Sequence, residues 1–173
     1  FLCIASALNR QGEVARQKGE RFYAVETGAG ASTLALIFYS MKYDGVAMSW
    51  DLNGQKASEI RTAAAETLGM QNEKNVNRHW KFVQYSSNSP YLGLGIVRDM
   101  TKQVHFSLHD SEHTWNTLSG ELQTIEPLMA EGGIVALDDA SYTFLHTDEI
   151  YLNIQRKKHG LTAIETVPEN RTD

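Results

Sequence analysis

One stretch constrains the fold more than any other part of the chain: FYAVETGAGASTLALIF, residues 22–38. It begins with a short aromatic and β-branched run, continues through a glycine-broken turn, and ends in a longer apolar segment at residues 34–38. This order predicts a strand, a tight turn and a helix that packs on a sheet. Small residues in such a turn let the backbone approach a ligand closely.

Three classes of ligand use this geometry, and a strand–helix turn without any ligand is the fourth alternative. A nucleoside triphosphate loop needs a Lys directly before its Ser or Thr, but Ala31 stands before Ser32. NAD(P) binding uses a third glycine, and Thr33 occupies that place, which weakens this alternative. S-adenosylmethionine carries an ammonium group and no phosphate. An acidic residue ahead of the glycines suits it, and Glu26 stands two residues before Gly28.

The composition is that of one ordinary soluble domain. The chain has 173 residues, 42% of them hydrophobic, and a formal net charge of −5, so a single domain over residues 1–173 is expected. No basic cluster stands out beyond residues 156–158, which argues against a nucleic-acid partner. No apolar run approaches the length of a membrane span, so no membrane partner is expected either.

The cysteine content and the first residues bear on location. Cys3 is the only cysteine, so no disulfide forms within the chain and a Cys-rich metal site is excluded. A reducing compartment, the cytoplasm, is the expected location. The opening FLCIASAL lacks the basic segment of a signal peptide and predicts an N-terminal helix. Because the chain starts at Phe1 and not at Met, we expect residues to precede it.

Apolar runs and helical patterns alternate along the chain. The predicted strands are residues 22–27, 46–51, 79–86, 104–109, 133–138 and 161–167. Amphipathic helices are predicted at 58–68, at 114–129 and at 148–158, and the apolar face of the second is Trp115, Leu118, Leu122, Ile125 and Met129. This alternation predicts an α/β fold of the Rossmann-like, doubly wound type, in which helices cover both faces of a mostly parallel sheet.

Ligands of such sheets bind beyond the carboxyl ends of the strands, so the residues that end strands are candidates for a site. They are Glu26, Asp51, Ser86, Asp110, Asp138 and Asp139. Asp51 follows the glycine turn by about twenty residues, where an acidic side chain accepts both ribose hydroxyls of an adenosine. Enzymes that bind NAD and enzymes that bind S-adenosylmethionine both have an acidic residue at this location, so Asp51 does not distinguish between the two cofactors. An exposed loop Asp is the alternative.

The strongest signal lies in residues 109–141, HDSEHTWNTLSGELQTIEPLMAEGGIVALDDAS. One strand ends at Asp110, a helix returns, two glycines turn, and the next strand ends at Asp138 and Asp139. Adjacent parallel strands bring their carboxyl ends together, so we expect three carboxylates to converge. They would raise one another's pKa unless a cation neutralised them, and Mg²⁺ is the first choice for oxygen ligands. The alternative is a helix-capping Asp110 with two solvated neighbours.

These motifs, taken in order, resemble class I S-adenosylmethionine-dependent methyltransferases. The pattern Asp-x-(Asp/Glu)-His-(Ser/Thr)-aromatic, a helix, Gly-Gly and Asp-Asp is similar to a small-molecule branch of that family. The branch includes the sugar, macrolide and catechol O-methyltransferases and relatives named cephalosporin hydroxylases. The resemblance covers residues 20–167.

The resemblance implies a cofactor site. Glu26, Gly28 and Gly30 would shape the methionine side of the pocket, with Ser32 near the carboxylate and Asp51 on the ribose.

At the adenine edge, Tyr85-Ser86-Ser87 stands where many relatives have Gly-Asp-Ser, which makes Ser86 the candidate contact. Asp110, Asp138 and Asp139 would hold the metal, although catechol-type enzymes often have Asn at the last place.

His113 and Asp110 are the catalytic candidates. His113 lies where catechol-type relatives place a Lys base, and an imidazole with a pKa of about 6.5 accepts a hydroxyl proton at neutral pH. A structural histidine that orients a carboxylate is the alternative, and a His-based transition-metal site stays open. His105 and His109 alternate along a strand and are expected to pack or to form hydrogen bonds. Trp115 starts an apolar face, so we expect it in the core.

The resulting hypothesis is a methyl transfer from S-adenosylmethionine to an oxygen of a small-molecule acceptor, with a divalent metal lowering the pKa of the acceptor hydroxyl. The rivals are an NAD(P)-dependent oxidoreductase, for which no Tyr-x-x-x-Lys pair is apparent, and a non-catalytic binding module of the same fold. The acceptor and the oligomeric state, monomer or homo-oligomer, stay open. The fold also needs a last antiparallel strand, which residues 168–173 are too short and polar to supply.

Overall fold

A computed structural model of the chain describes residues 2–68, 73–112 and 114–138, and in addition residues 153, 154, 157 and 160. The chain divides into two compact units, residues 1–138 and 139–173, and every element named below belongs to the first. The predicted strand at 161–167 lies outside the described residues. Of the predicted helix at 148–158, residues 153, 154 and 157 are described, and they are helical.

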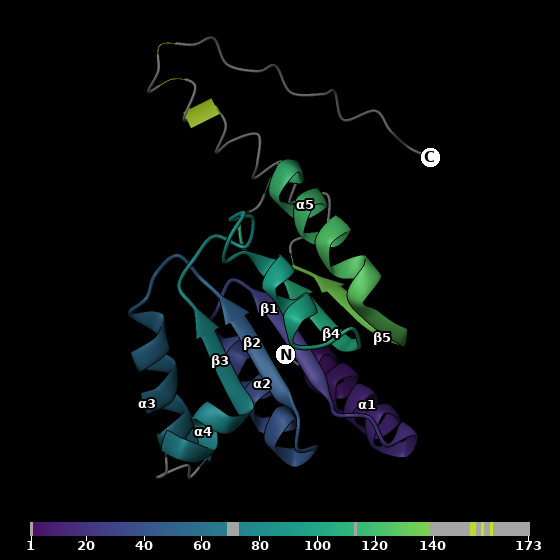
Figure 1. Ribbon diagram of the computed structural model, residues 1–173. Helices are drawn as coiled ribbons and strands as arrows, with labels where there is room; N and C mark the ends of the chain where they lie inside the picture. The colour runs from purple at the N-terminus through teal and green to yellow at the C-terminus, as the bar shows by residue number, and fades with distance from the viewer. Residues whose placement is uncertain are drawn as a thin grey trace. The chain divides into compact units, whose positions relative to one another are not determined.

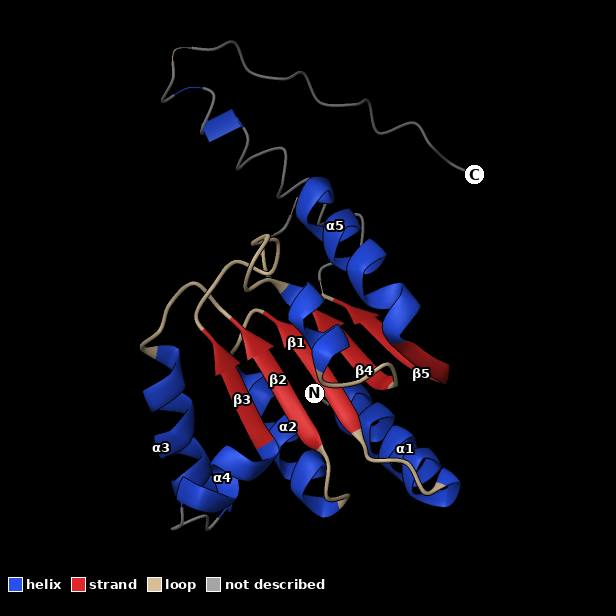
Figure 2. Ribbon diagram, viewed as in Figure 1, coloured by secondary structure: helices blue, strands red, loops and turns tan. Residues whose placement is uncertain are grey.

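The described residues form a parallel sheet of five strands in the order β3-β2-β1-β4-β5 (Figures 1 and 2). The strands are β1 (Tyr23–Thr27), β2 (Val46–Trp50), β3 (Trp80–Val83), β4 (Val104–His109) and β5 (Met129–Leu137). From β1 the chain builds outward to β3, and it then returns to add β4 and β5 on the other side of β1. The doubly wound α/β fold predicted from the sequence is therefore confirmed, and its switch point lies between β1 and β4.

The helices divide between the two faces of this sheet. They are α1 (Leu2–Lys18), α2 (Ala31–Lys42), α3 (Lys56–Leu68), α4 (Glu73–His79) and α5 (Trp115–Ile125), with short 3₁₀ segments at Leu94–Asp99 (η1) and Glu126–Leu128 (η2). One core packs α1 to α4 against one face, and it includes Leu8, Leu36, Ile60, Val76 and Phe106. A second core packs η1 and α5 against the other face, and it includes Val25, Trp50, Leu94, Val97 and Ile125.

The sequence placed several elements to within a few residues, and the two largest boundary differences adjoin each other: the helix predicted at 114–129 ends at Ile125, and β5 begins early. This strand begins at Met129 rather than at residue 133, directly after η2. Its pairing with β4 shifts register, since Val104 faces Met129 while Phe106 faces Ile134. The glycine turn predicted at 132–133 is therefore an irregularity inside the strand, and Gly132 adopts the φ of 77° that such a bulge requires.

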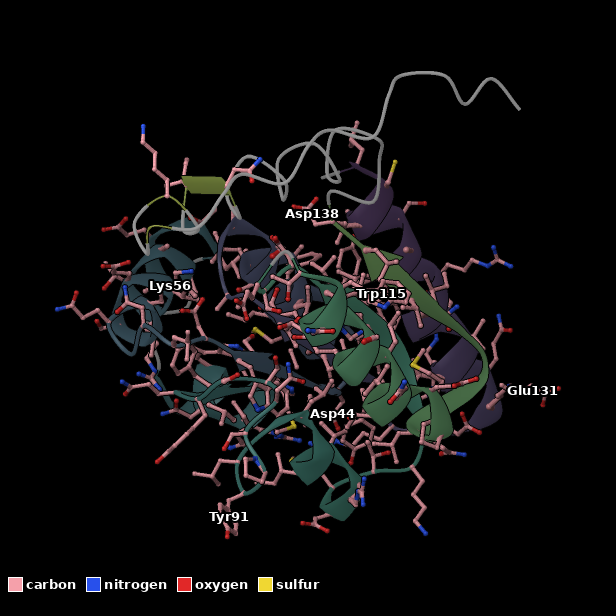
Figure 3. All side chains as sticks on the ribbon, turned by 90° about the horizontal axis from the view of Figure 1, so that it is seen from above. Asp44, Lys56, Tyr91, Trp115, Glu131 and Asp138 are labelled. Atoms are coloured by element: carbon pink, nitrogen blue, oxygen red, sulfur yellow. The ribbon has the colours of Figure 1, made fainter. Side chains whose placement is uncertain are left out.

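The prediction for Trp115 was wrong. Its side chain is 72% exposed at the start of α5 (Figure 3). The residues that α5 buries are Thr117, Glu121 and Ile125, which recur every four positions on one face. Trp115 lies on a different face because polar side chains, and not only apolar ones, dock this helix onto the sheet.

The described part of the chain contains no helix with the length and apolar character needed to cross a membrane.

Candidate functional site

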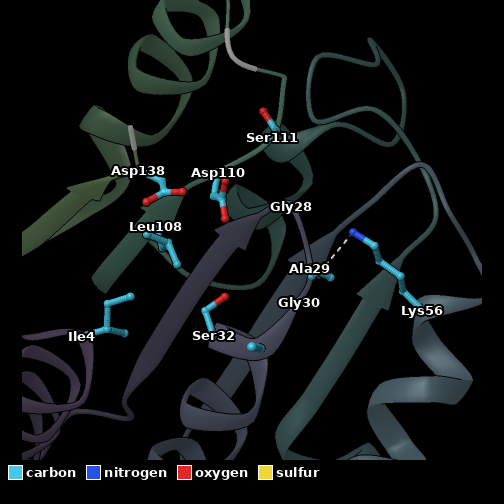
Figure 4. A pocket seen from close by; sticks show the side chains of 11 residues that line it. Ile4, Gly28, Ala29, Gly30, Ser32, Lys56, Leu108, Asp110, Ser111 and Asp138 are labelled. Atoms are coloured by element: carbon cyan, nitrogen blue, oxygen red, sulfur yellow. Dashed lines mark hydrogen bonds between the residues drawn. The ribbon is translucent and has the colours of Figure 1, made fainter. Parts of the chain in front are cut away.

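A pocket of about 530 Å³ opens at the carboxyl edge of the sheet, at the switch point between β1 and β4 (Figure 4). Its walls come from the loop that joins β1 to α2, from the first residues of α2, from the end of β4, from the residues that follow β4 and β5, and from one side chain each of α1 and α3. The lining residues are Ile4, Gly28, Ala29, Gly30, Ala31, Ser32, Lys56, Leu108, Asp110, Ser111 and Asp138. Five of the predicted site residues are therefore brought together here: Gly28, Gly30, Ser32, Asp110 and Asp138.

The two glycines of the turn have different physical roles. Gly28 has a φ of 83°, and a Cβ at this position would lie 1.6 Å from the carbonyl oxygen of Asp110. Gly28 thus lets the loop after β1 pack directly on the residues after β4. A Cβ on Gly30 would meet no protein atom within 4 Å. Since Gly30 lines the pocket, its bare backbone leaves a cradle that a ligand can fill.

Glu26 lies beneath the glycine loop and does not line the pocket. It is 0% exposed, and its carboxylate accepts hydrogen bonds from the hydroxyls of Ser32 (2.9 Å), Thr33 (2.5 Å) and Ser49 (2.6 Å). Burial raises the pKa of Glu26 to about 7, although the three hydrogen bonds act in the opposite direction. Ser32 connects Glu26 to the pocket, because its hydroxyl donates to Glu26 and the residue also lines the cavity.

Asp51 follows β2 and borders the pocket through its partners. Its Oδ2 accepts the backbone N–H of Ala29 (3.0 Å) and a proton of the Lys56 ammonium (2.6 Å), while Oδ1 accepts the N–H of Asn53 (2.8 Å). The same ammonium donates to the carbonyl oxygen of Ala29 at 2.8 Å. Asp51 therefore fixes two lining residues, and Lys56 closes this side of the pocket (Figure 4).

Asp110 and Asp138 line the same side of the pocket (Figure 4). Backbone hydrogen bonds continue the strand pairing to this point, from Asp110 N–H to the carbonyl of Thr27 (2.9 Å) and from Asp138 N–H to that of His109 (3.0 Å). Two carboxylates facing one cavity are the oxygen donors that Mg²⁺ prefers.

The third predicted metal ligand, Asp139, and the predicted base, His113, lie outside the described residues. Among the residues that the structure does describe, no three His, Cys, Asp or Glu side chains form a group that could hold a metal ion. Ser86, the predicted adenine contact, is exposed in the loop after β3 and is not among the lining residues; its hydroxyl accepts the N–H of Asn88 at 3.3 Å.

Glu121, a buried carboxylate on α5, was not among the predicted site residues. It accepts hydrogen bonds from Thr27 (2.8 Å), from His109 Nδ1 (2.8 Å), from Ser111 (2.6 Å) and from the hydroxyl of Ser87. Burial alone would raise the pKa of Glu121, but the hydrogen bonds outweigh it and lower the pKa below its usual value. Its four-residue spacing from Thr117 and Ile125 is the signal that would have placed it inward.

His109 and His105 are both buried and hydrogen bonded, as the alternation along the strand predicted. Nε2 of His109 lies 2.7 Å from the Ser107 hydroxyl. Ser107, His109 and Glu121 are therefore connected by hydrogen bonds in the same order as the Ser, His and acidic residue of a hydrolytic triad. Ser107 is 0% exposed, however, and no substrate carbonyl can reach it. This part of the network is structural.

A family model described as "Methyltransferase domain" matches residues 1–140, which include the whole sheet and every described residue of the pocket. The chain belongs to this methyltransferase family. The resemblance to class I S-adenosylmethionine-dependent methyltransferases that the sequence suggested is thereby confirmed. No curated protein matches the chain in sequence.

Two solved structures show the same fold as this methyltransferase. The apo structure of CalS11, a TDP-rhamnose 3′-O-methyltransferase of calicheamicin biosynthesis, is 15% identical, with 98% of this chain and 74% of that chain aligned at a TM-score of 0.63. The S-adenosylhomocysteine-bound methyltransferase PaMTH1 of Podospora anserina is 16% identical, with 86% and 60% aligned at a TM-score of 0.51. At these identities the likeness shows the fold alone.

Proposed function

We propose that this methyltransferase moves the methyl group of S-adenosylmethionine to an oxygen of a small molecule. The observation that carries the proposal is the pocket itself, because a glycine loop with an open cradle at Gly30 faces the carboxylates of Asp110 and Asp138 across one cavity. One side suits the cofactor and the other suits the acceptor.

The cofactor would lie along the loop from Gly28 to Ser32. In this arrangement Gly30 provides close backbone approach, Ser32 contacts the methionine carboxylate, and Asp51 accepts the ribose hydroxyls. Glu26 acts beneath the loop through Ser32. Ser86, from the loop after β3, is the proposed contact to the adenine.

The chemistry requires little beyond placement and proton removal. The sulfonium is already an activated methyl donor, so the protein must hold the acceptor oxygen in line with the methyl group and accept the hydroxyl proton. His113 is the proposed base, three residues after Asp110. Asp110 orients the acceptor from the pocket wall.

Asp110, Asp138 and Asp139 are the proposed holders of a divalent cation, Mg²⁺ first. When bound, such an ion would lower the pKa of the acceptor hydroxyl and fix its direction. The two of these carboxylates that the structure describes face the pocket, which supports the assignment.

The name of CalS11 says that this structural neighbour methylates a sugar hydroxyl of TDP-rhamnose. This supports a hydroxylated small molecule as the acceptor class here. We propose that the enzyme works in the cytoplasm without a nucleic-acid or membrane partner. A homo-oligomer is compatible with this proposal.

Calorimetry with S-adenosylmethionine, S-adenosylhomocysteine and NAD tests the proposal. We expect both sulfur ligands to bind and NAD not to bind, and we expect Asp51→Ala to weaken S-adenosylhomocysteine binding by about 1–3 kcal/mol, because the ribose hydroxyls lose their acceptor. Binding of NAD without S-adenosylhomocysteine would sink the cofactor assignment. Cofactor binding with no transfer to any hydroxylated acceptor would favour the non-catalytic alternative.

A further inference from the structure

Glu121 joins parts of the chain that are distant in sequence but meet at the carboxyl edge of the sheet. Its Oε2 accepts from Thr27, which ends β1, and from His109, which ends β4. Its Oε1 accepts from Ser87, in the loop after β3, and from Ser111, in the loop after β4. At 1% exposure, this carboxylate has four donors for four acceptor positions.

One of these four donors also lines the pocket. Ser111 contributes to the wall next to Asp110, and its hydroxyl donates to Glu121 at 2.6 Å. The other three donors, Thr27, Ser87 and His109, are not among the lining residues. Ser111 is therefore the one donor through which Glu121 bonds directly to the described pocket lining, whereas Thr27 and His109 only adjoin lining residues along the chain.

We propose that Glu121 is a positioning residue, which acts through Ser111 to hold the Asp110–Ser111 wall of the pocket in place. Without this bond, the segment after β4 keeps its backbone hydrogen bond to Thr27 and its packing on Gly28, but the Ser111 side chain loses its hydrogen bond to the buried carboxylate beneath the wall.

The chemistry of the network requires a carboxylate at this position. A carboxylate only accepts hydrogen bonds, so His109 donates from Nδ1 to Glu121, while its Nε2 lies 2.7 Å from the Ser107 hydroxyl. An amide in place of the carboxylate accepts on one oxygen only and presents N–H groups to donors. Glu121→Gln therefore keeps the shape of the side chain while it breaks the pattern of donors and acceptors.

A first experiment needs no ligand. The Asp110 amide is protected by its bond to the Thr27 carbonyl (2.9 Å), so its hydrogen exchange reports on the wall. We expect Glu121→Gln to speed exchange at Asp110 and its neighbours at least tenfold, with amides of β2 and β3 unchanged. An equal acceleration throughout the sheet, or none at Asp110, would overturn the proposal.

A matched pair of hydroxyl deletions keeps the test valid if Glu121→Gln does not fold. Ser111→Ala and Thr27→Val each remove one hydrogen bond to the same carboxylate, and Val preserves the shape of Thr. We expect Ser111→Ala to speed exchange at Asp110 and Thr27→Val to leave it within about twofold. Equal effects of the two substitutions would reduce Glu121 to a general stabiliser.

A second experiment, which rests on the proposed function, measures S-adenosylhomocysteine affinity in a double-mutant cycle. We expect Glu121→Gln to raise the Kd about tenfold, to have almost no effect in the Ser111→Ala background, and to keep its full effect in the Thr27→Val background. Multiplicative effects of Glu121→Gln and Ser111→Ala would contradict the proposal. If the unaltered protein does not bind this ligand, the proposed function fails, while the exchange experiment still decides the role of Glu121.

Discussion

Glu26 and Thr27 are consecutive residues of β1, and their side chains join two separate buried carboxylate clusters on opposite faces of the sheet. Glu26 turns toward α2 and accepts from Ser32, whereas Thr27 turns toward α5 and donates to Glu121. The pKa values of the two carboxylates are shifted in opposite directions. Burial raises the pKa of Glu26 to about 7, while the pKa of Glu121 is below its usual value because its hydrogen bonds outweigh burial.

The proton of Glu26 has one natural position. The hydroxyl of Thr33 accepts an N–H from Gly30 (2.9 Å) and that of Ser49 accepts the indole N–H of Trp80 (2.8 Å), so both hydroxyls donate onward to Oε1. A proton on the acid therefore lies on Oε2, which faces Ser32.

We expect protonation of Glu26 to reverse its hydrogen bond with Ser32. The acid then donates from Oε2, the Ser32 oxygen accepts, and the Ser32 hydroxyl is released to donate into the pocket that it lines. Ionisation has the opposite effect, because the carboxylate again needs the Ser32 proton.

The first prediction is that Glu26 makes unfolding dependent on pH. The folded pKa of about 7 exceeds the ordinary value of 4.5, so between these values the folded state holds a proton that the unfolded state has released. The free energy of unfolding therefore falls as the pH rises through this window, by up to about 3 kcal/mol at 1.36 kcal/mol per unit. Glu26→Gln, which mimics the protonated acid, removes this loss.

Urea denaturation at pH 5 and pH 8 measures the effect. The free energy of unfolding of Glu26→Gln minus that of the unaltered protein should be about 2–3 kcal/mol larger at pH 8 than at pH 5. Glu59→Gln, which changes an exposed carboxylate on α3, is the control. The same stability difference at both pH values would show that Glu26 is ionised throughout.

The fold and half of the site were predictable because their signals are local or topological. A strand, a glycine turn and an apolar helix are visible in residues 22–38, and the rule that parallel strands end at one edge placed Asp110 and Asp138 together. Neither inference depends on how side chains pack.

The remaining features depend on packing between side chains that are distant in the sequence. Glu121 is a helical Glu, a residue type that is normally solvated, and only its four polar partners make burial tolerable. The apolar character of Trp115 predicts a core position, although α5 docks through Thr117 and Glu121. Lys56 carried no motif, and its role follows from its 2.6 Å contact with Asp51.

The second prediction separates the two glycines of the turn. Gly28→Ala forces a side chain onto a φ of 83° and against the carbonyl oxygen of Asp110, so we expect a loss of at least about 2 kcal/mol in the free energy of unfolding. Gly30→Ala has an extended φ of −170° and free space around its Cβ. Its stability should change by less than about 1 kcal/mol.

Ligand binding gives the complementary result for Gly30→Ala. If the cofactor packs on this backbone, the added methyl group weakens S-adenosylhomocysteine binding although the fold is intact. Thermal denaturation and calorimetry on the same samples measure both quantities. Unaltered affinity in Gly30→Ala would place the ligand away from this loop.

The third prediction concerns Lys56. Its ammonium occupies an acceptor position on Oδ2 of Asp51, which a ribose diol needs if both hydroxyls are to bind this carboxylate. We therefore expect Lys56→Met to tighten S-adenosylhomocysteine binding by about fivefold, the equivalent of about 1 kcal/mol for one hydrogen bond. The Lys56 side chain is 38% exposed, so the ion pair contributes less than about 1 kcal/mol to stability.

Lys81→Met, on the exposed part of β3, controls for the loss of one positive charge. It should leave the affinity unchanged. Weaker binding in Lys56→Met would mean that the ammonium contacts the ligand rather than competing with it.

The last prediction tests the proposed metal at Asp110, Asp138 and Asp139. Calorimetric titration of the protein with Mn²⁺ alone should show one binding site. Asp138→Ala should remove this site, because the remaining carboxylates cannot neutralise and hold the ion. Asp99→Ala, an exposed carboxylate of η1, should retain the site. EDTA should abolish methyl transfer and leave S-adenosylhomocysteine affinity nearly intact, and Mg²⁺ should restore turnover.

His113 supplies the contrast that decides between a chelation mechanism and simple proximity. His113→Ala should spare Mn²⁺ binding and lower the rate of transfer by about 10²–10⁴-fold if the imidazole is the base. Full activity in EDTA together with a slow His113→Ala enzyme would end the metal proposal. Methyl transfer would then rest on the alignment of the acceptor in the pocket and on proton removal by His113 alone.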